Sequence, residues 1–132
     1  MFNPTQIEKI LSESKTQKWP YPKIFDALKE AGVEFYEVDV STYNITYYGS
    51  GKTWQEPAPK GFVVISIDNN FDVKEIQAAL ERNRRKETTY VQFLQGIARA
   101  GVGAYRVDMA ERTVTYKGLK GEAYPENIPV IN

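Results

Sequence analysis

The chain of 132 residues contains no cysteine and no histidine. It therefore forms no disulfide, and it has no thiolate or imidazole to act as nucleophile, general base or transition-metal ligand. Catalysis of the Ser-His-Asp or Cys-His type is excluded for the same reason. Any chemistry must come from carboxylates, Lys, Arg, Ser, Thr or the nine tyrosines. We predict no catalytic residue, no metal site and no cofactor, and we lean against an enzyme.

The sequence also lacks an excess of charge of either sign. Lys plus Arg and Asp plus Glu number 17 each, so the formal net charge at pH 7 is +0. A balanced chain creates no field that attracts nucleic acid or an anionic membrane, and neither is expected as a partner. The sequence has no apolar run of membrane-spanning length and no signal-peptide pattern at its N-terminus. We expect a cytoplasmic monomer or homodimer whose partner is an unknown protein or small molecule.

What the sequence does contain is an apparent internal repeat. Residues 100–118 resemble residues 31–49, and the relation extends back along the chain at a constant shift of 69 positions. Over 48 aligned positions without a gap, 13 are identical. Self-similarity at a fixed period is the signature of a duplicated structural unit. We predict one domain, residues 1–132, built of two copies: residues 1–68 and 69–132.

Each copy is predicted to begin with two helices. Asn3 and Asp72 precede apolar residues at helical spacing and are expected to cap the first helix of each copy. In the second copy Thr89 begins a capping box for the second helix. Gly32 and Gly101 follow the second helices, where a left-handed backbone favours glycine. The residues therefore predict both the beginnings and the ends of these helices.

Three strands are predicted after the helices of each copy. Alternating residues predict strands over 33–40 and 102–109, each forming a hairpin with a return strand. Residues 62–67 are predicted as a third strand, with 128–131 as its shorter counterpart, and residues 49–61 as the longest loop. Each copy thus reads helix-helix-strand-strand-strand. The predicted fold class is α+β, with antiparallel sheets, helices on one face and a pseudo-twofold between the copies.

The second copy carries several spaced motifs: Tyr90-x-x-Phe93-Leu94, Ile97-Ala98-x-Ala100-Gly101-Val102, Tyr105-x-Val107-Asp108, Tyr116-x-Gly118 and Glu122-x-Tyr124 followed by Ile128-Pro129-x-Ile131. In these motifs the chain resembles the YbcV-like family of small uncharacterised bacterial proteins, often labelled "phage envelope protein". The resemblance supplies no activity, cofactor or catalytic set. It implies a phage or prophage association, which makes a structural phage component one candidate function.

Asp39 and Asp108 occupy equivalent positions of the two copies, at the end of a predicted strand. If the copies face each other, the two carboxylates could share a proton or hold a cation across the pseudo-twofold. That arrangement would give a carboxylate-based enzyme or a cation-binding site. The alternative, which we favour, is that each aspartate accepts backbone N–H bonds in its own hairpin turn.

Other candidate site residues differ between the copies. Arg106, Arg112, Glu122 and Tyr124 occupy polar positions of the second copy that have no match in the first, which predicts an asymmetric function. Arg106 and Arg112 could form a one-sided anion site, although solvated charge on a sheet face is the more ordinary interpretation. Trp54 lies in a loop rich in glycine and proline and is predicted to anchor a partner. These features favour a non-enzymatic binding or protein-interaction module.

The tyrosines recur at matched positions, among them Tyr36 and Tyr105, and Tyr47 and Tyr116. They could line a groove between the copies for a flat ligand, because small-molecule pockets are mostly apolar with a few polar groups. The other interpretation is core packing in which each hydroxyl reaches the rim. The alternation places these residues on the helix-facing side of their strands, which favours the core interpretation.

Overall fold

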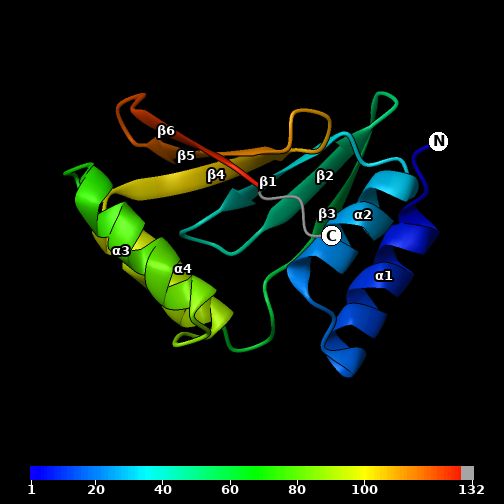
Figure 1. The fold of residues 1–132 in the computed structure, drawn as a ribbon, viewed down its shortest axis with the longest axis horizontal. Coiled ribbons are helices and arrows are strands. Elements are labelled where there is room, and N and C mark those ends of the chain that lie inside the picture. Colours follow the sequence, from blue (N-terminus) through cyan, green and yellow to red (C-terminus); the bar gives the residue numbers. More distant parts are fainter. Residues whose placement is uncertain (129–132) are drawn as a thin grey trace.

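The computed structural model describes residues 1–128, in which it contains four helices and six strands (Figure 1). The helices are α1 (Pro4–Gln17), α2 (Tyr21–Glu30), α3 (Val73–Arg84) and α4 (Tyr90–Arg99). The strands are β1 (Phe35–Asp39), β2 (Ile45–Gly49), β3 (Lys52–Glu56), β4 (Val102–Asp108), β5 (Thr113–Gly118) and β6 (Ala123–Asn127). Two helices precede three strands in each half, and the predicted α+β class is confirmed. The origin of the halves by duplication stays a prediction.

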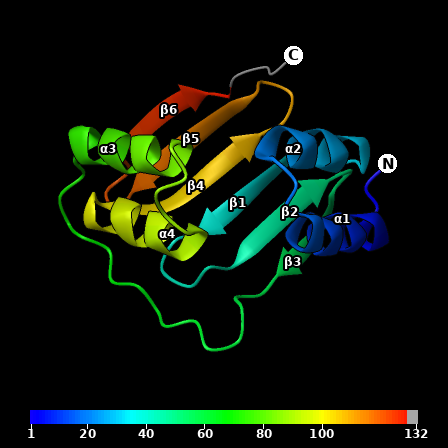
Figure 2. The same ribbon diagram turned by 60° about the horizontal axis from the view of Figure 1, so that its bottom comes forward.

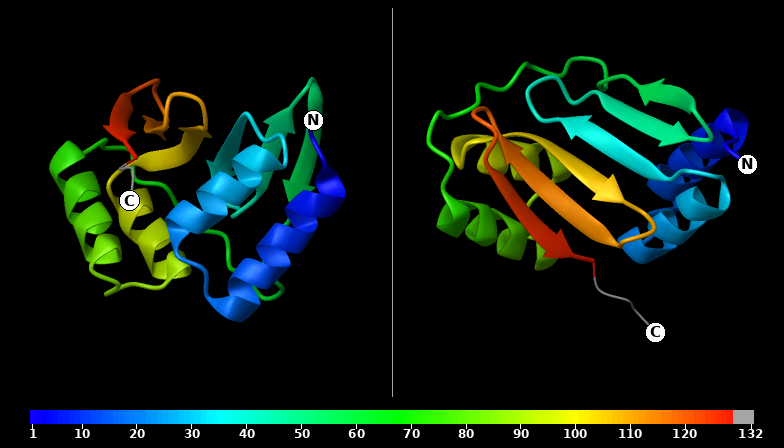
Figure 3. Two further views of the ribbon diagram at one scale, coloured as in Figure 1. Left: turned by 45° about the vertical axis from the view of Figure 1, so that its right-hand side comes forward. Right: turned by 90° about the horizontal axis from the view of Figure 1, so that it is seen from above.

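The six strands form one antiparallel sheet in the order β3-β2-β1-β4-β5-β6 (Figure 3). The two halves therefore share a continuous sheet and meet where β1 pairs with β4. At the centre of this pairing Glu37 lies opposite Arg106, and these two residues are equivalent positions of the predicted copies. The pairing extends symmetrically to both sides of them, as the predicted pseudo-twofold requires.

All four helices lie on one face of the sheet (Figure 2). Helices α1 and α2 belong to the half with β1, β2 and β3, and helices α3 and α4 to the half with β4, β5 and β6. Side chains alternate across the strands, so that Tyr36 and Val38 are buried whereas Glu37 and Asp39 lie on the open face. The buried apolar side chains form one core that both halves share; its fully buried members include Ile7, Phe25, Leu28, Ile76, Leu94, Ile97, Val102 and Val107.

Helices α1, α3 and α4 begin, and helices α2 and α4 end, at the predicted signals. Asn3 and Asp72 each accept a hydrogen bond from the backbone N–H three residues further on, at 3.1 and 3.2 Å. Thr89 forms the predicted capping box with the residue at the third helical position. Gly32 and Gly101 both have φ of +92°, and a Cβ at either residue would collide with a backbone carbonyl oxygen. The helix boundaries are therefore set by local chemistry.

The predicted third strands are wrong. The strand that follows β2 is β3, inside the segment expected to be a loop, because Ser50 and Gly51 adopt φ of 51° and 72° and turn the chain straight back. Two consecutive positive φ values form the tight turn that matches the twist of a hairpin. Residues 62–67 adopt no regular secondary structure in spite of their strand-like composition. The place of the third strand of this half, next to β2, is taken by β3.

The segment between β3 and α3 instead runs past α4 (Figure 2). Three backbone hydrogen bonds hold it to other parts of the chain: Ile65 donates to Ser41, Asp68 to Ala98 and Asp72 to Ala100. In the second half the third strand, β6, ends at Asn127 and includes none of the residues predicted for it. Of those residues, 129–131 lie outside the described part of the chain.

Candidate functional site

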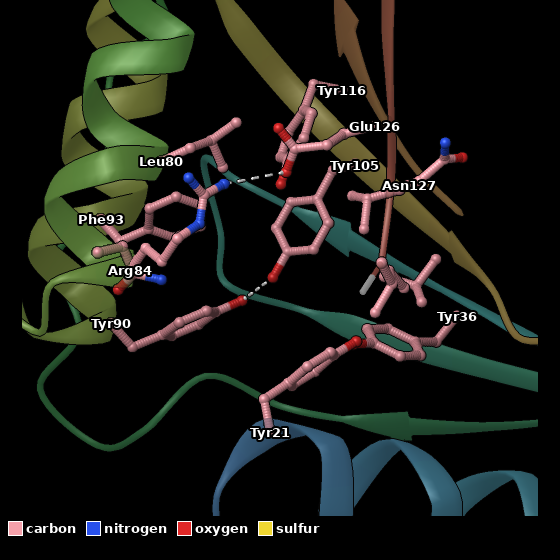
Figure 4. Close-up of a pocket in the computed structure, with 14 residues that line it drawn as sticks. Tyr21, Tyr36, Leu80, Arg84, Tyr90, Phe93, Tyr105, Tyr116, Glu126 and Asn127 are labelled. Carbon is pink, nitrogen blue, oxygen red and sulfur yellow. Dashed lines mark hydrogen bonds and ion pairs between the residues drawn. The ribbon is translucent and has the colours of Figure 1, made fainter. Parts of the chain in front are cut away.

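A cavity of about 330 Å³ opens on the helix-facing side of the sheet (Figure 4). Residues of α3, α4, β4, β5 and β6 line it, so most of its wall belongs to the second half. The first half contributes Tyr21 from α2 and Tyr36 from β1. The cavity therefore lies at the junction of the two halves.

Two pairs of tyrosine hydroxyls meet at this cavity. The hydroxyl oxygens of Tyr21 and Tyr36 are 2.7 Å apart, and those of Tyr90 and Tyr105 are 2.6 Å apart. Each pair joins the first residue of a helix, α2 or α4, to the strand that follows that helix. The two pairs occupy equivalent positions of the halves. The fold thus brings four hydroxyl groups to one region from four different elements.

Burial keeps these phenols protonated. Removal from water raises the pKa of Tyr36 and of Tyr105 well above the ordinary value. Burial also raises the pKa of Tyr21 and of Tyr90, and in both cases the hydrogen bond to the paired tyrosine opposes the shift. At neutral pH the four groups are uncharged hydrogen-bond donors and acceptors.

Much of the remaining wall of the cavity is aromatic and aliphatic, and Asn83 and Asn127 add two amide groups. The ring of Tyr105 lies 5.6 Å from that of Tyr116 and meets the ring of Phe93 edge-on at 6.5 Å, between ring centroids. Val107 and Val114 complete the surface on the sheet side. Flat rings and branched aliphatic side chains together give a surface suited to a planar apolar molecule.

Charged groups at this cavity are paired with one another. A guanidinium nitrogen of Arg84 lies 3.8 Å from a carboxylate oxygen of Glu126 (Figure 4). Another guanidinium nitrogen of Arg84 lies 2.7 Å from a carboxylate oxygen of Glu81. The first half has a related pair, Lys15 and Glu56, at 2.9 Å. Since these pairs are partly exposed, each contributes little to stability. At the cavity, the positive charge of Arg84 and the negative charge of Glu126 therefore lie next to each other.

The two halves differ at the turns that connect β1 with β2 and β4 with β5. Tyr43 and Arg112 occupy equivalent positions in these turns, and both have positive φ, at 69° and 54°. The Tyr43 ring meets the Tyr90 ring at 5.2 Å, whereas the Arg112 guanidinium lies 4.4 Å above the ring of Phe25. Each turn thus packs against a helix of the other half. The turn between β1 and β2 does so through an aromatic ring, and the turn between β4 and β5 does so through a cation.

Comparison with known proteins places the chain in a family. Residues 6–124 match the family described as "Protein of unknown function (DUF1398)". The chain belongs to this family. Its relatives include "Uncharacterized protein Rv2012" of Mycobacterium tuberculosis (strain ATCC 25618 / H37Rv) and "Uncharacterized protein Mb2035" of Mycobacterium bovis. Each is 27% identical over 114 residues, which cover 84% of this chain and 68% of the relative.

These relatives carry no named activity, so the DUF1398 membership supports an uncharacterised family and no particular chemistry. The YbcV-like label and the phage association stay predictions. Within residues 1–128 no helix combines the length and the apolar character needed to cross a membrane. The function must therefore be argued from the site itself.

The structure separates the two aspartates that were considered as a carboxylate pair. In the antiparallel pairing of β1 with β4, Asp39 lies opposite Ala104 and Asp108 opposite Phe35, at opposite ends of the pairing. Each accepts a backbone hydrogen bond in its own turn, Asp39 at 3.2 Å and Asp108 at 2.9 Å. A site shared across the pseudo-twofold is thus contradicted. The described residues also contain no cluster of three acidic side chains that could hold a metal ion.

Arg106 and Arg112 do not form a common anion site, because they lie on opposite faces of the sheet. Arg106 is on the open face, where its guanidinium lies 3.7 Å above the ring of Phe35 and 3.4 Å from Glu37. Lys117 approaches the same Glu37 carboxylate oxygen at 3.5 Å. Arg112 packs instead against α2 on the helix side. Arg106 is therefore part of a network of oppositely charged side chains at the junction of the halves.

The other predicted site residues have local structural contacts. Trp54 is half-buried on the edge strand β3, 5.8 Å from the ring of Tyr47, and so is not a loop residue. A carboxylate oxygen of Glu122 accepts the backbone N–H of Lys120 in the turn before β6. The Tyr124 hydroxyl accepts a hydrogen bond of 3.1 Å from the Gln77 amide. None of these three predicted residues lines the cavity.

Sequence reasoning missed Tyr21, Tyr90, Arg84 and Glu126 as site residues. The signal for the two tyrosines was their identity in the two copies, which marks them as equivalent but not as partners of Tyr36 and its counterpart. The strand tyrosines Tyr36, Tyr47, Tyr105 and Tyr116 are buried, as the core interpretation predicts, and all of them except Tyr47 also line the cavity. Core packing and cavity lining are therefore two aspects of one arrangement.

Proposed function

We propose that the chain is a non-enzymatic binding protein that holds a small, largely apolar molecule in the tyrosine-lined cavity. The observation that carries this proposal is the meeting of two hydrogen-bonded tyrosine pairs, each with a buried strand member, Tyr36 or Tyr105, in a cavity with a largely apolar lining. Ligand sites are typically cavities of roughly 300–1,000 Å³ with a few polar groups in an apolar lining. A cavity of about 330 Å³ falls in this range, near its lower end.

Binding is favoured over catalysis by the chemistry available at the cavity. The sequence has no histidine or cysteine, and the raised pKa of the tyrosines makes them weak acids at neutral pH. The charged groups nearby are engaged with one another. What the cavity offers to a ligand is apolar surface and neutral hydrogen-bonding groups.

The expected affinity is modest. A ligand of about 15 non-hydrogen atoms that gains roughly 0.3–0.5 kcal/mol per atom binds with about 5–7 kcal/mol. This corresponds to a dissociation constant of roughly 10–200 µM. Screening should therefore be carried out at high protein concentration.

The test uses N-phenyl-1-naphthylamine, an uncharged fluorescent probe, titrated into the full chain. We expect enhanced probe emission that saturates, and a loss of at least tenfold in affinity for Val114→Trp, which places an indole at the half-buried cavity wall. Thr115→Trp is the matched control, because it introduces the same side chain at the next residue of β5, on the opposite face. Equal affinity of the two variants, or no saturable binding by the unmodified chain, would contradict the proposal.

A structural phage component and a cytoplasmic location also stay predictions. The phage component requires stable higher oligomers, which sedimentation velocity measures directly. A monomer at all accessible concentrations would remove that candidate and leave the binding proposal untouched.

A further inference from the structure

Each tyrosine pair retains one hydroxyl proton that its own hydrogen bond does not use. A phenol has a single O–H donor, so a pair has two protons and one shared bond. Within residues 1–128 the four hydroxyls make no hydrogen bond other than those inside the pairs. In whichever direction each internal bond runs, one O–H per pair stays available as a donor.

The two pairs stand on neighbouring positions of the sheet. Tyr36 is opposite Val107, and Tyr105 is two residues before Val107 on the same strand. The two strand tyrosines are therefore diagonal neighbours on one face, with their Cα atoms roughly 7–8 Å apart. Figure 4 shows the helix tyrosines Tyr21 and Tyr90 reaching toward them from below the sheet. A single small molecule in the cavity can approach both pairs.

The lining disfavours an ion as the ligand. Of the charged residues along the cavity, Arg84 and Glu126 contact each other, and Arg84 also contacts Glu81. A charged molecule entering the apolar part of the cavity would lose its hydration without gaining an unengaged counter-charge. A neutral molecule with polar acceptor atoms avoids this cost and satisfies the free O–H groups.

Resting on the proposed function, we infer that the cavity selects an uncharged, planar, conjugated molecule that carries a carbonyl-type hydrogen-bond acceptor. The tyrosine pairs donate to the acceptor, and the rings of Tyr105, Tyr116 and Phe93 contact the flat body. A site that presents buried donors discriminates against ligands without acceptors, because those donors are then left unpaired.

The closing experiment compares two uncharged probes of the same ring system in the unmodified chain. One is 6-propionyl-2-(dimethylamino)naphthalene, which has a ketone, and the other is 6-propyl-2-(dimethylamino)naphthalene, in which a methylene replaces the carbonyl group. We expect the ketone to bind at least tenfold more tightly, with its bound emission at a longer wavelength than an apolar site alone would give. Since this comparison needs no variant, it does not depend on the folding of a mutant.

Variants then identify the donors. Tyr21→Phe removes one hydroxyl but leaves Tyr36 with a free O–H, so the preference for the ketone should persist. Replacing all four tyrosines, Tyr21, Tyr36, Tyr90 and Tyr105, by phenylalanine keeps the ring volume and removes both donors, so the two probes should bind equally. Tyr48→Phe, on the open face of the sheet, is the matched control and should change neither affinity.

The outcomes separate the two proposals. If both probes bind the unmodified chain equally, the ligand class is wrong and the cavity remains a binding site. If neither probe binds, and N-phenyl-1-naphthylamine does not bind either, the proposed function itself fails. A preference for the ketone that survives in the fourfold phenylalanine variant would assign the donor to another group and overturn the role of the tyrosines.

Discussion

The hydrogen bond between Tyr90 and Tyr105 allows a sharp test of how the cavity is built. The two oxygens are 2.6 Å apart, and the bond links the first residue of α4 to the middle of β4. We consider the variants Tyr90→Phe and Tyr105→Phe and the double variant. Each substitution removes one oxygen and keeps the ring, so the aromatic packing with Phe93 is preserved. The perturbation is thereby confined to the hydrogen bond.

The expected energies are not additive. Tyr90→Phe leaves the hydroxyl of the buried Tyr105 without its partner, which costs about 1–3 kcal/mol of unfolding free energy. Tyr105→Phe leaves the hydroxyl of the half-buried Tyr90, which is nearer to solvent, and should cost about 1 kcal/mol. The double variant has no orphaned hydroxyl, so its loss should be below about 1 kcal/mol. The coupling free energy between the two sites is then about 1–3 kcal/mol.

The assay is urea unfolding of the four proteins, followed by circular dichroism and analysed as a double-mutant cycle. Tyr48→Phe, on the open face, provides the control for loss of a tyrosine hydroxyl as such and should change stability by less than about 0.5 kcal/mol. If the losses of the two single variants simply add in the double variant, the hydroxyls are not coupled. The donor count on which the ligand class rests would then be refuted.

Three further predictions concern the fold. Gly101→Ala should lower the unfolding free energy by more than about 2 kcal/mol in urea titration, because the new Cβ would collide with the Asn70 carbonyl. Gly51→Ala is the control: Gly51 also has a positive φ but faces open space, so the loss should be about 1 kcal/mol. Glu37→Lys should destabilise the chain by about 1 kcal/mol at low salt and much less in 1 M NaCl, because it places like charges together on the exposed sheet face. Burial raises the pKa of tyrosines such as Tyr105 above the value in the unfolded chain. The unfolding free energy should therefore keep its full value below about pH 10 and fall as the pH rises further. Urea midpoints between about pH 8 and 12 measure this dependence. A flat profile, equal glycine variants, or a salt-independent Glu37→Lys would contradict the respective argument.

The centre of the sheet shows why the halves are not identical where they meet. Glu37 and Arg106 are equivalent positions of the predicted copies, and the antiparallel register places them opposite each other. The same charge at both positions would be repulsive, whereas the observed pair is attractive at 3.4 Å. The difference between the copies at this position, one of those that predict an asymmetric function, therefore has a structural reason.

The third strand shows where local reasoning fails. Residues 62–67 have a stronger β propensity than residues 52–56, yet the latter form β3. The deciding residues are Ser50 and Gly51, whose tight turn delivers the next five residues to the sheet edge at once. Propensity describes how well a segment fits a sheet, and the turn decides which segment arrives there.

The sequence by itself determined the helix caps at Asn3, Asp72 and Thr89, the glycine ends of α2 and α4, and the faces on which the residues of β1 and β4 point. These features depend on hydrogen bonds and torsion angles within a few residues, so their causes are contained in the local sequence. The tertiary structure decided the joining of the halves into one sheet, the separation of Asp39 from Asp108, and the meeting of the tyrosine pairs at one cavity. These depend on the register of β1 with β4 and on where α2 and α4 begin above them, and contacts between elements far apart in the chain fix that geometry.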